Sequence, residues 1–400
     1  MILALSLTAT TVARASAPTA AWTTTVTMNV QTGSVAIDHA GNVYVTGTRQ
    51  GLESVAVLRK FGPDGRPLWT RTWSQPDAHA GGELVAVAAT GSVYFAGSIG
   101  SNHFEGGAWF LRKYKPDGTL VWARDEPGWQ HGGTADSPSG LATTAAGAVL
   151  SGSFQGCCGD FRIRDGWVLS FGADGRRKWR NGFEPGSGLN AFSDVADSVA
   201  VGANGGIFVG GWTALGAESE EVTADHELLL QRLDRGGSVV WSRSFPETAD
   251  DDQEFDADLA VHGDALMVEA FVDGSDIRGS GRPGHTWLGR FTLGGDLRWS
   301  RSWGRSSRRA AQPSALAVAG RGRTFVIGMR RDPSDHGLDV FLRAYTVSGR
   351  LVWGATRQAG QRFLVGADVA WRSDVMIATG EALAHRYGRG TRGYVWSFAA

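Results

Sequence analysis

A glycine placed four residues before a tryptophan recurs six times along the chain, and this spacing constrains the fold most strongly. In each copy the glycine is preceded by Asp, Gly or Ser. The tryptophans are Trp69, Trp122, Trp179, Trp241, Trp299 and Trp353. Asp-Gly and Gly-Gly pairs between alternating apolar runs are strong hairpin signals, because the central turn residues need positive φ. Each copy therefore predicts a β-hairpin whose second strand carries the Trp.

Two further strand signals precede each hairpin, and they are clearest in the first copy. There, residues 34–38, 41–47 and 55–61 alternate apolar and polar side chains between turn residues. Each unit therefore has four strands, which we call a to d. Copies of strands a to c occur seven times. The 57 glycines among 400 residues fit the many tight turns that an all-β chain of this kind requires.

The seventh copy, residues 364–398, has strands a to c but no hairpin after them. The missing strand d is found at the other end of the chain, in residues 21–28, where Trp22 takes the strand d position. This arrangement predicts a seven-bladed β-propeller with four antiparallel strands per blade, closed 3+1 by the N-terminal strand. Closure of this kind removes exposed sheet edges.

The expected domain is a single propeller over residues 16–400, with residues 20–28 as the seam strand. The predicted blades span about 33–75, 82–126, 136–184, 194–246, 255–304, 311–358 and 362–400, the last completed by 20–28. A large flat ring near the outer end of each blade can fill the wedge between neighbouring sheets. We therefore assign a structural blade-docking role to Trp22, Trp69, Trp122, Trp179, Trp241, Trp299 and Trp353.

Residues 38–47 (DHAGNVYVTG), together with 60–65 (KFGPDG) and Trp69, resemble the bacterial SBBP-type β-propeller repeat and the related delta-60 repeat. The resemblance implies an exported propeller and carries no common catalytic residues. The Gly-x-x-x-Trp turn is also similar to the blades of quinoprotein dehydrogenases, which bind pyrroloquinoline quinone. That weaker similarity concerns packing.

Composition excludes several functional classes. A hydrophobic fraction of 42% with 20% charged residues predicts a soluble globular chain. The formal net charge of -1 creates no field that would attract nucleic acid. The first fifteen residues combine an apolar run with Ala13-Arg-Ala15, which is typical of a signal peptide and predicts an extracellular, cell-surface or periplasmic location. The rest of the sequence has no apolar run long enough to predict a membrane span. A closed ring leaves few edges to pair, so we expect a monomer.

The connections between strands b and c and between strands d and a should share one face of the ring. The b–c loops are long in several units, and long loops on a rigid scaffold often carry binding residues. The most concentrated charge also lies here, in the d–a connection before the fifth unit. Its carboxylates could supply oxygen ligands to Ca²⁺, although a solvated acidic loop is the alternative. The candidate ligands are Asp250, Asp251, Asp252, Asp256 and Asp258.

Cys157 and Cys158 are the only cysteines, and they are adjacent between two glycines in a long b–c loop. In an oxidising compartment they could form a vicinal disulfide, and two free thiols are the alternative. No catalytic residue can be assigned, because the sequence contains no nucleophile elbow, P-loop or zinc-ligand spacing. The sequence therefore favours a non-catalytic scaffold that binds a protein, glycan or cell-surface component through this face. One alternative is an enzyme of the quinoprotein or lyase/hydrolase type with its site at the channel mouth, and another is a purely structural or adaptor module.

Overall fold

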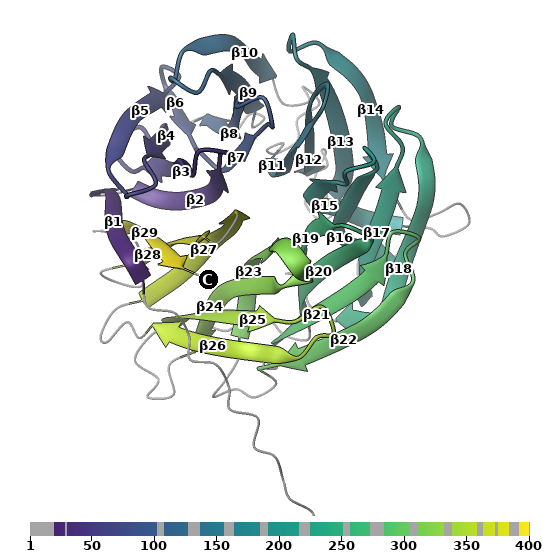
Figure 1. The fold of residues 1–400 in the computed structure, drawn as a ribbon. Helices are drawn as coiled ribbons and strands as arrows, with labels where there is room; N and C mark the ends of the chain where they lie inside the picture. The colour runs from purple at the N-terminus through teal and green to yellow at the C-terminus, as the bar shows by residue number, and fades with distance from the viewer. Residues whose placement is uncertain are drawn as a thin grey trace, which may run out of the picture.

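The computed structural model shows seven β-sheets arranged as a ring around a common axis (Figure 1). It describes residues 20–28, 30–101, 108–126, 137–155, 164–184, 191–215, 225–250, 257–272, 284–304, 311–331, 338–357, 363–372, 375–383 and 392–399. Within these residues the fold is nearly all strand, and no helix has the length and apolar character needed to cross a membrane.

The first four blades follow one another along the chain. Blade 1 contains β2 (Val30–Ile37), β3 (Val43–Arg49), β4 (Val55–Phe61) and β5 (Pro67–Trp73). Blade 2 contains β6 (Ala78–Ala80), β7 (Leu84–Val87), β8 (Val93–Ser101), β9 (Ala108–Tyr114) and β10 (Leu120–Glu126). Blade 3 contains β11 (Ser137–Thr144), β12 (Gly147–Gln155), β13 (Arg164–Gly172) and β14 (Arg177–Phe183). Blade 4 contains β15 (Ala191–Val201), β16 (Ile207–Leu215), β17 (Asp225–Leu233) and β18 (Val239–Asp250).

The remaining blades use the rest of the chain and its first strand. Blade 5 contains β19 (Ala257–His262), β20 (Ala265–Val272), β21 (His285–Thr292) and β22 (Leu297–Trp303). Blade 6 contains β23 (Ala311–Val318), the short 3-10 helix η1 (Gly320–Gly322), β24 (Thr324–Arg331), β25 (Leu338–Tyr345) and β26 (Leu351–Arg357). Blade 7 contains β27 (Phe363–Arg372), β28 (Val375–Leu383), β29 (Arg392–Ala399) and β1 (Ala20–Met28).

Strands within a blade pair antiparallel with their neighbours in sequence, from strand a near the axis to strand d at the rim. Blade 2 differs in one respect, since its inner strand is split into β6 and β7, which both pair with β8. The prediction of a seven-bladed β-propeller with four antiparallel strands per blade is confirmed.

Strands from both ends of the described chain form blade 7. β1 pairs antiparallel with β29, and the sheet order is β1-β29-β28-β27. Figure 1 shows β1 beside β29, next to the first blade. The Trp22 indole also donates a hydrogen bond to the Pro63 carbonyl of blade 1, at 2.9 Å. β1 thus occupies in blade 7 the position that strand d holds in every other blade.

The hydrophobic core is divided among the interfaces between blades. Seven large clusters of buried side chains occur, and each joins two neighbouring sheets around the ring. Between blades 1 and 2, for example, Tyr44 and Leu58 pack against Phe95 and Phe110. A single blade has no core of its own, because each sheet buries its faces against the sheets on either side. The stability of the ring therefore depends on blade docking.

A repeated contact at the rim fixes this docking. Six tryptophans of strand d donate their indole N–H to a carbonyl in the c–d turn of the next blade, at 2.9 to 3.2 Å. The accepting residue always lies two positions before the turn glycine. The pairs are Trp22 with Pro63, Trp69 with Pro116, Trp122 with Ala173, Trp179 with Arg235, Trp241 with Leu293, and Trp299 with Val347. In blade 6, the corresponding residue Trp353 is buried at the interface with blade 7.

A second side chain of strand d strengthens five of these contacts. The residue two positions after the Trp donates to the carbonyl of the turn glycine itself, at 2.7 to 3.1 Å. It is Arg in four blades and Asn in the other. The donors are Arg71, Arg124, Asn181, Arg243 and Arg301. In these five turns, two carbonyls that lie two residues apart thus accept bonds from the preceding blade, which sets the position of one sheet on the next.

Replacing a turn glycine by alanine tests this docking. Gly175 has φ of +79°, and an added Cβ would lie 2.8 Å from the Trp122 ring. Gly263 also has positive φ, +60°, but nothing lies within 4 Å of an added Cβ, so Gly263→Ala is a matched control. The left-handed backbone should cost each variant about 1 kcal/mol. Gly175→Ala should lose a further 1 to 3 kcal/mol, roughly, because the ring must move. Equal losses in chemical denaturation would contradict the docking role.

Deleting residues 16–28 tests whether β1 completes the ring. The deletion leaves the edge of β29 unpaired and removes the Trp22 contact with blade 1. We expect a loss of more than about 3 kcal/mol in the free energy of unfolding, or loss of the cooperative transition. A deletion of residues 16–19 alone serves as the control and should have little effect. An unchanged melting curve after the longer deletion would refute closure by this strand.

Candidate functional site

A cavity of about 590 Å³ lies where the inner strands of all seven blades meet. It is lined by residues in or beside β2, β7, β11, β15, β19, β23 and β27, with Glu269 from β20 and Met329 from β24. The lining residues lie in the middle part of most inner strands, such as residues 32–35 of β2 and 367–368 of β27, so the cavity occupies the central channel of the ring.

A short sequence pattern places one side chain of each blade on the wall of this cavity. The pattern is a variable residue followed by Val or Leu and then Ala, and it occupies the same register in every inner strand. All seven variable residues line the cavity. They are Ser34, Leu84, Gly140, Ser198, Asp258, Ala315 and Asp368. The sequence analysis did not use this pattern, although it was visible as a repeat.

β-Bulges turn these residues toward the axis. In five blades the pairing of the inner strand with strand b shifts register immediately before the variable residue. A bulge leaves one residue outside the ladder and redirects its side chain and peptide groups. The freed groups bond to neighbouring blades. Ser34 N–H donates to the Glu83 carbonyl at 2.9 Å, and Ser139 Oγ donates to the Ala196 carbonyl at 3.1 Å.

Asp258 joins three blades at the cavity wall. Its Oδ2 accepts the N–H of Leu316 in blade 6 at 2.9 Å. Its Oδ1 accepts the hydroxyl of Ser198 in blade 4 at 2.6 Å and the N–H of Leu259 at 2.8 Å. Burial raises the pKa of this carboxyl above its usual range, and these hydrogen bonds oppose the shift only in part. The sequence analysis grouped Asp258 with the acidic loop, whereas the structure places it in β19 on the channel.

Asp368 makes the equivalent connection between the last and first blades. Its Oδ2 accepts the Val35 N–H at 2.7 Å, and its Oδ1 accepts the Val369 N–H at 2.7 Å. Burial raises its pKa to about 7, the Val35 N–H opposes the shift, and the charge of Asp258 adds to it. Glu83 is a third carboxyl on the same cavity. Burial raises its pKa to about 7 against the hydrogen bonds from Ser98. These groups therefore titrate near neutral pH.

The other predicted site residues lie outside the described part of the chain or at its margin. Asp251, Asp252, Asp256, Cys157 and Cys158 fall outside the described residues, and Asp250 is described only as the last backbone position of β18. Among the residues that the structure describes, no group of three or more His, Cys, Asp or Glu is arranged to hold a metal ion. The Ca²⁺ loop and the vicinal disulfide remain predictions.

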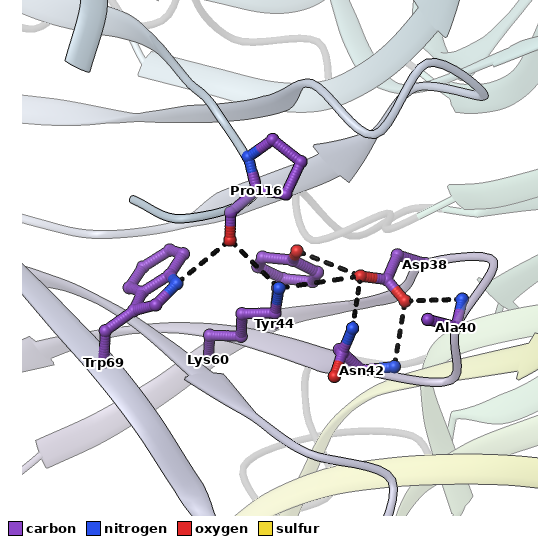
Figure 2. Close-up of polar contacts among 7 residues, drawn as sticks. All are labelled: Asp38, Ala40, Asn42, Tyr44, Lys60, Trp69 and Pro116. Atoms are coloured by element: carbon purple, nitrogen blue, oxygen red, sulfur yellow. Dashed lines mark hydrogen bonds and ion pairs between the residues drawn. The ribbon is translucent and has the colours of Figure 1, made fainter. Parts of the chain in front are cut away.

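A second polar cluster, in blade 1, uses the residues that carry the repeat resemblance. Asp38 Oδ1 accepts the N–H groups of Ala40 and Asn42, both at 2.9 Å, and its Oδ2 accepts from the side chains of Asn42 and Tyr44 (Figure 2). Lys60 lies 3.8 Å from Asp38 and 5.0 Å from the centre of the Tyr44 ring. Burial would raise the pKa of Asp38, but its hydrogen bonds, led by those from Asn42, lower it overall.

This cluster docks blade 1 on blade 2. Lys60 Nζ donates to the Pro116 carbonyl at 2.9 Å, and the Trp69 indole donates to the same oxygen at 3.1 Å (Figure 2). Lys113 repeats the arrangement in blade 2, where it shares the Ala173 carbonyl with Trp122. The polar groups of the cluster are thus engaged in turn formation and blade docking. The repeat motif accordingly has a structural explanation, and the channel cavity is the better functional candidate.

Comparison with known proteins supports the fold. No protein-family model and no curated protein matches the sequence. Solved structures that share the architecture include the polysaccharide lyase Uly1, with TM-score 0.53, 10% identity and coverage of 95% of this chain and 99% of that one. An ulvan lyase of polysaccharide lyase family PL25 has TM-score 0.53, 9% identity and coverage of 94% and 96%. The α-L-arabinanase of Penicillium chrysogenum has TM-score 0.50, 9% identity and coverage of 94% and 98%. At these identities the likeness shows the fold alone.

The raised carboxyl pKa values predict a stability that falls as pH rises. In the folded state Asp368 binds its proton up to a pKa of about 7, whereas an unperturbed Asp carboxyl has a pKa of 3.8. Between pH 3.8 and about 7, Asp368 is protonated in the folded state and ionised in the unfolded state. Its contribution to the free energy of unfolding is therefore complete below about pH 4 and is lost as pH rises through 7. Asp368→Asn removes this titration. The decrease in the free energy of unfolding between about pH 5 and pH 8 should therefore be smaller in the variant by roughly 2 kcal/mol.

Chemical denaturation at a series of pH values measures this effect. Glu53→Gln is the control, because Glu53 is exposed on the surface of blade 1. That variant should keep the pH dependence of the unmodified chain. If Asp368→Asn also kept the full slope, the carboxyl would not be protonated in the folded state, and the electrostatic description of the cavity would be wrong.

Proposed function

We propose that this protein is a non-catalytic propeller that binds a hydroxyl-rich saccharide in the channel cavity. The observation that carries the proposal is the cavity itself, about 590 Å³ in size and lined by all seven inner strands. A volume in this range suits a small ligand or one or two residues of a longer chain.

The chemistry of the wall suits a ligand of this kind. Hydroxyls line the cavity on four blades, from Ser34, Ser139, Ser198 and Ser314, and carboxyls line it beside them. Sugar hydroxyls donate to carboxylates and both donate to and accept from serine hydroxyls. The fold also fits, since the solved propellers that share it include polysaccharide lyases and an arabinanase. An export signal and an extracellular location would place the protein where saccharides occur, and both stay predictions from the sequence.

The bonding of the carboxyls favours binding over catalysis. A carboxylate has about four lone-pair positions for hydrogen bonds. At Asp258 three of them hold Ser198, Leu259 and Leu316. A general acid or base must exchange its proton with substrate, and a carboxyl that holds two neighbouring blades in place is poorly suited to that exchange. Pyrroloquinoline quinone fits still less well, because its carboxylates would face the acidic wall.

A hydrolase or lyase is the second candidate, and one observation favours it. Asp258 and Asp368 share the cavity, the pKa of each is raised by burial, and the charge of Asp258 raises that of Asp368 further. Pairs of carboxyls with perturbed pKa values supply the acid and base in many glycosidases. Release of reducing ends or of unsaturated products by the unmodified chain, lost in Asp258→Asn, would establish this candidate in place of the first.

A cavity-filling substitution tests saccharide binding. Ser314→Trp places a large ring on the cavity wall and should weaken binding of oligosaccharides by about tenfold or more. Ser348→Trp is the matched control, because Ser348 is exposed in the c–d turn of blade 6. A glycan array identifies the bound oligosaccharides, and isothermal titration calorimetry measures the affinities. Binding that survives Ser314→Trp, or no binding by the unmodified chain, would overturn the proposal.

A further inference from the structure

We infer that the ligand of the channel carries a primary ammonium group, so that the saccharide is an amino sugar with a free amine. This inference rests on the proposed function and narrows it to one substrate class. Three observations carry it: the sign of the charge on the cavity wall, the open acceptor positions on its carboxyls, and a buried hydroxyl without a partner.

The wall of the cavity is acidic throughout. Five carboxyl side chains line it, from four different blades, and none of its lining residues, all within the described chain, is Lys, Arg or His. The carboxyls are Glu83, Asp197, Asp258, Glu269 and Asp368. The chain as a whole has a net charge of only -1, so this concentration is local. Above about pH 7, where Asp368 and Glu83 lose their protons, a channel lined by one sign of charge focuses the potential and favours a ligand of opposite sign.

Two of these carboxyls keep positions for a further donor. Asp258 uses about three of its four lone-pair positions, and Asp368 accepts from Val35, Val369 and the Ser34 hydroxyl. By this count, one lone-pair position on each ionised carboxylate is not used by these bonds. An ammonium group has three N–H donors and can bond to more than one carboxylate. It would also relieve the repulsion between Asp258 and Asp368, which a neutral hydroxyl does less well.

A buried hydroxyl points independently to a ligand. Thr32 lines the same cavity, and its side chain is only 7% exposed. Its Oγ1 has no hydrogen-bond partner in the described part of the chain. An unsatisfied buried hydroxyl is unfavourable, and the loss is recovered when a bound molecule supplies a donor or acceptor. The hydroxyls of a sugar ring provide both, whereas a bare inorganic cation provides no hydrogen-bond donor or acceptor.

The same wall disfavours acidic saccharides. An ulvan lyase with TM-score 0.51 is bound to GlcA(1-4)Rha3S repeats, which carry a carboxylate and a sulfate. In the cavity described above, such groups would meet carboxyl groups and no cationic side chain. The two proteins share a fold at 9% identity, and the charge of this cavity indicates a different ligand.

The test compares short glucosamine oligomers with N-acetylglucosamine oligomers of the same length, by isothermal titration calorimetry on the full chain. The two differ in the free amine. We expect the glucosamine oligomer to bind at least about tenfold more tightly. Asp258→Asn and Asp368→Asn should each remove most of that difference, and Glu83→Gln provides a third variant should either fail to fold. Asp264→Asn, at a side chain 94% exposed, should leave both affinities unchanged.

The possible outcomes separate this inference from the proposed function. Tighter binding of the amine, lost in the channel variants, supports both. Equal binding of the two oligomers that is weakened by Ser314→Trp supports saccharide binding in the channel and overturns the amine requirement. Binding of spermidine without binding of glucosamine oligomers overturns the assignment to a sugar. Absence of any binding overturns both.

Discussion

The structure depends on the contact between a tryptophan of one blade and the c–d turn of the next. A single blade buries neither face alone, so its stability comes from its two neighbours. The indole N–H, the glycine beneath the ring and the Arg two residues later fix how far one sheet is shifted and tilted against the other. At six of the seven interfaces this contact joins each sheet to the next.

The channel cavity lies at the centre of the ring that these contacts hold together. The inner strands approach the axis, and their bulges release peptide groups and side chains from the β ladders. Asp258 and Asp368 then connect adjacent blades by accepting backbone N–H groups across the interface. Their cost is the burial of carboxyl groups of like charge, which raises their pKa values. The proposed ammonium ligand would offset this cost, because it carries hydrogen-bond donors and a positive charge.

The sequence predicted the fold because its signals are local. The turn glycine and Trp122 lie within one hairpin, and spacing alone reveals such a repeat. The channel cavity was not predicted, because its residues are far apart in the sequence. Glu83, Asp258 and Asp368 lie in different blades and meet only because the ring closes. Clustered charge drew the prediction to the loop around Asp252, whereas two of the cavity carboxyls, Asp258 and Asp368, occupy the same repeat position in different inner strands. Aligning the inner strands on the Val/Leu-Ala pattern would have shown that the position before it varies widely.

The most direct measurement of the central claim is a crystal structure of the full chain with a glucosamine oligomer. The account predicts the sugar in the channel, with an ammonium nitrogen within hydrogen-bonding distance of Asp258 or Asp368 and a sugar hydroxyl at Thr32 Oγ1. An oligomer bound only at the rim, or a channel occupied by ordered water alone at saturating ligand, would contradict it.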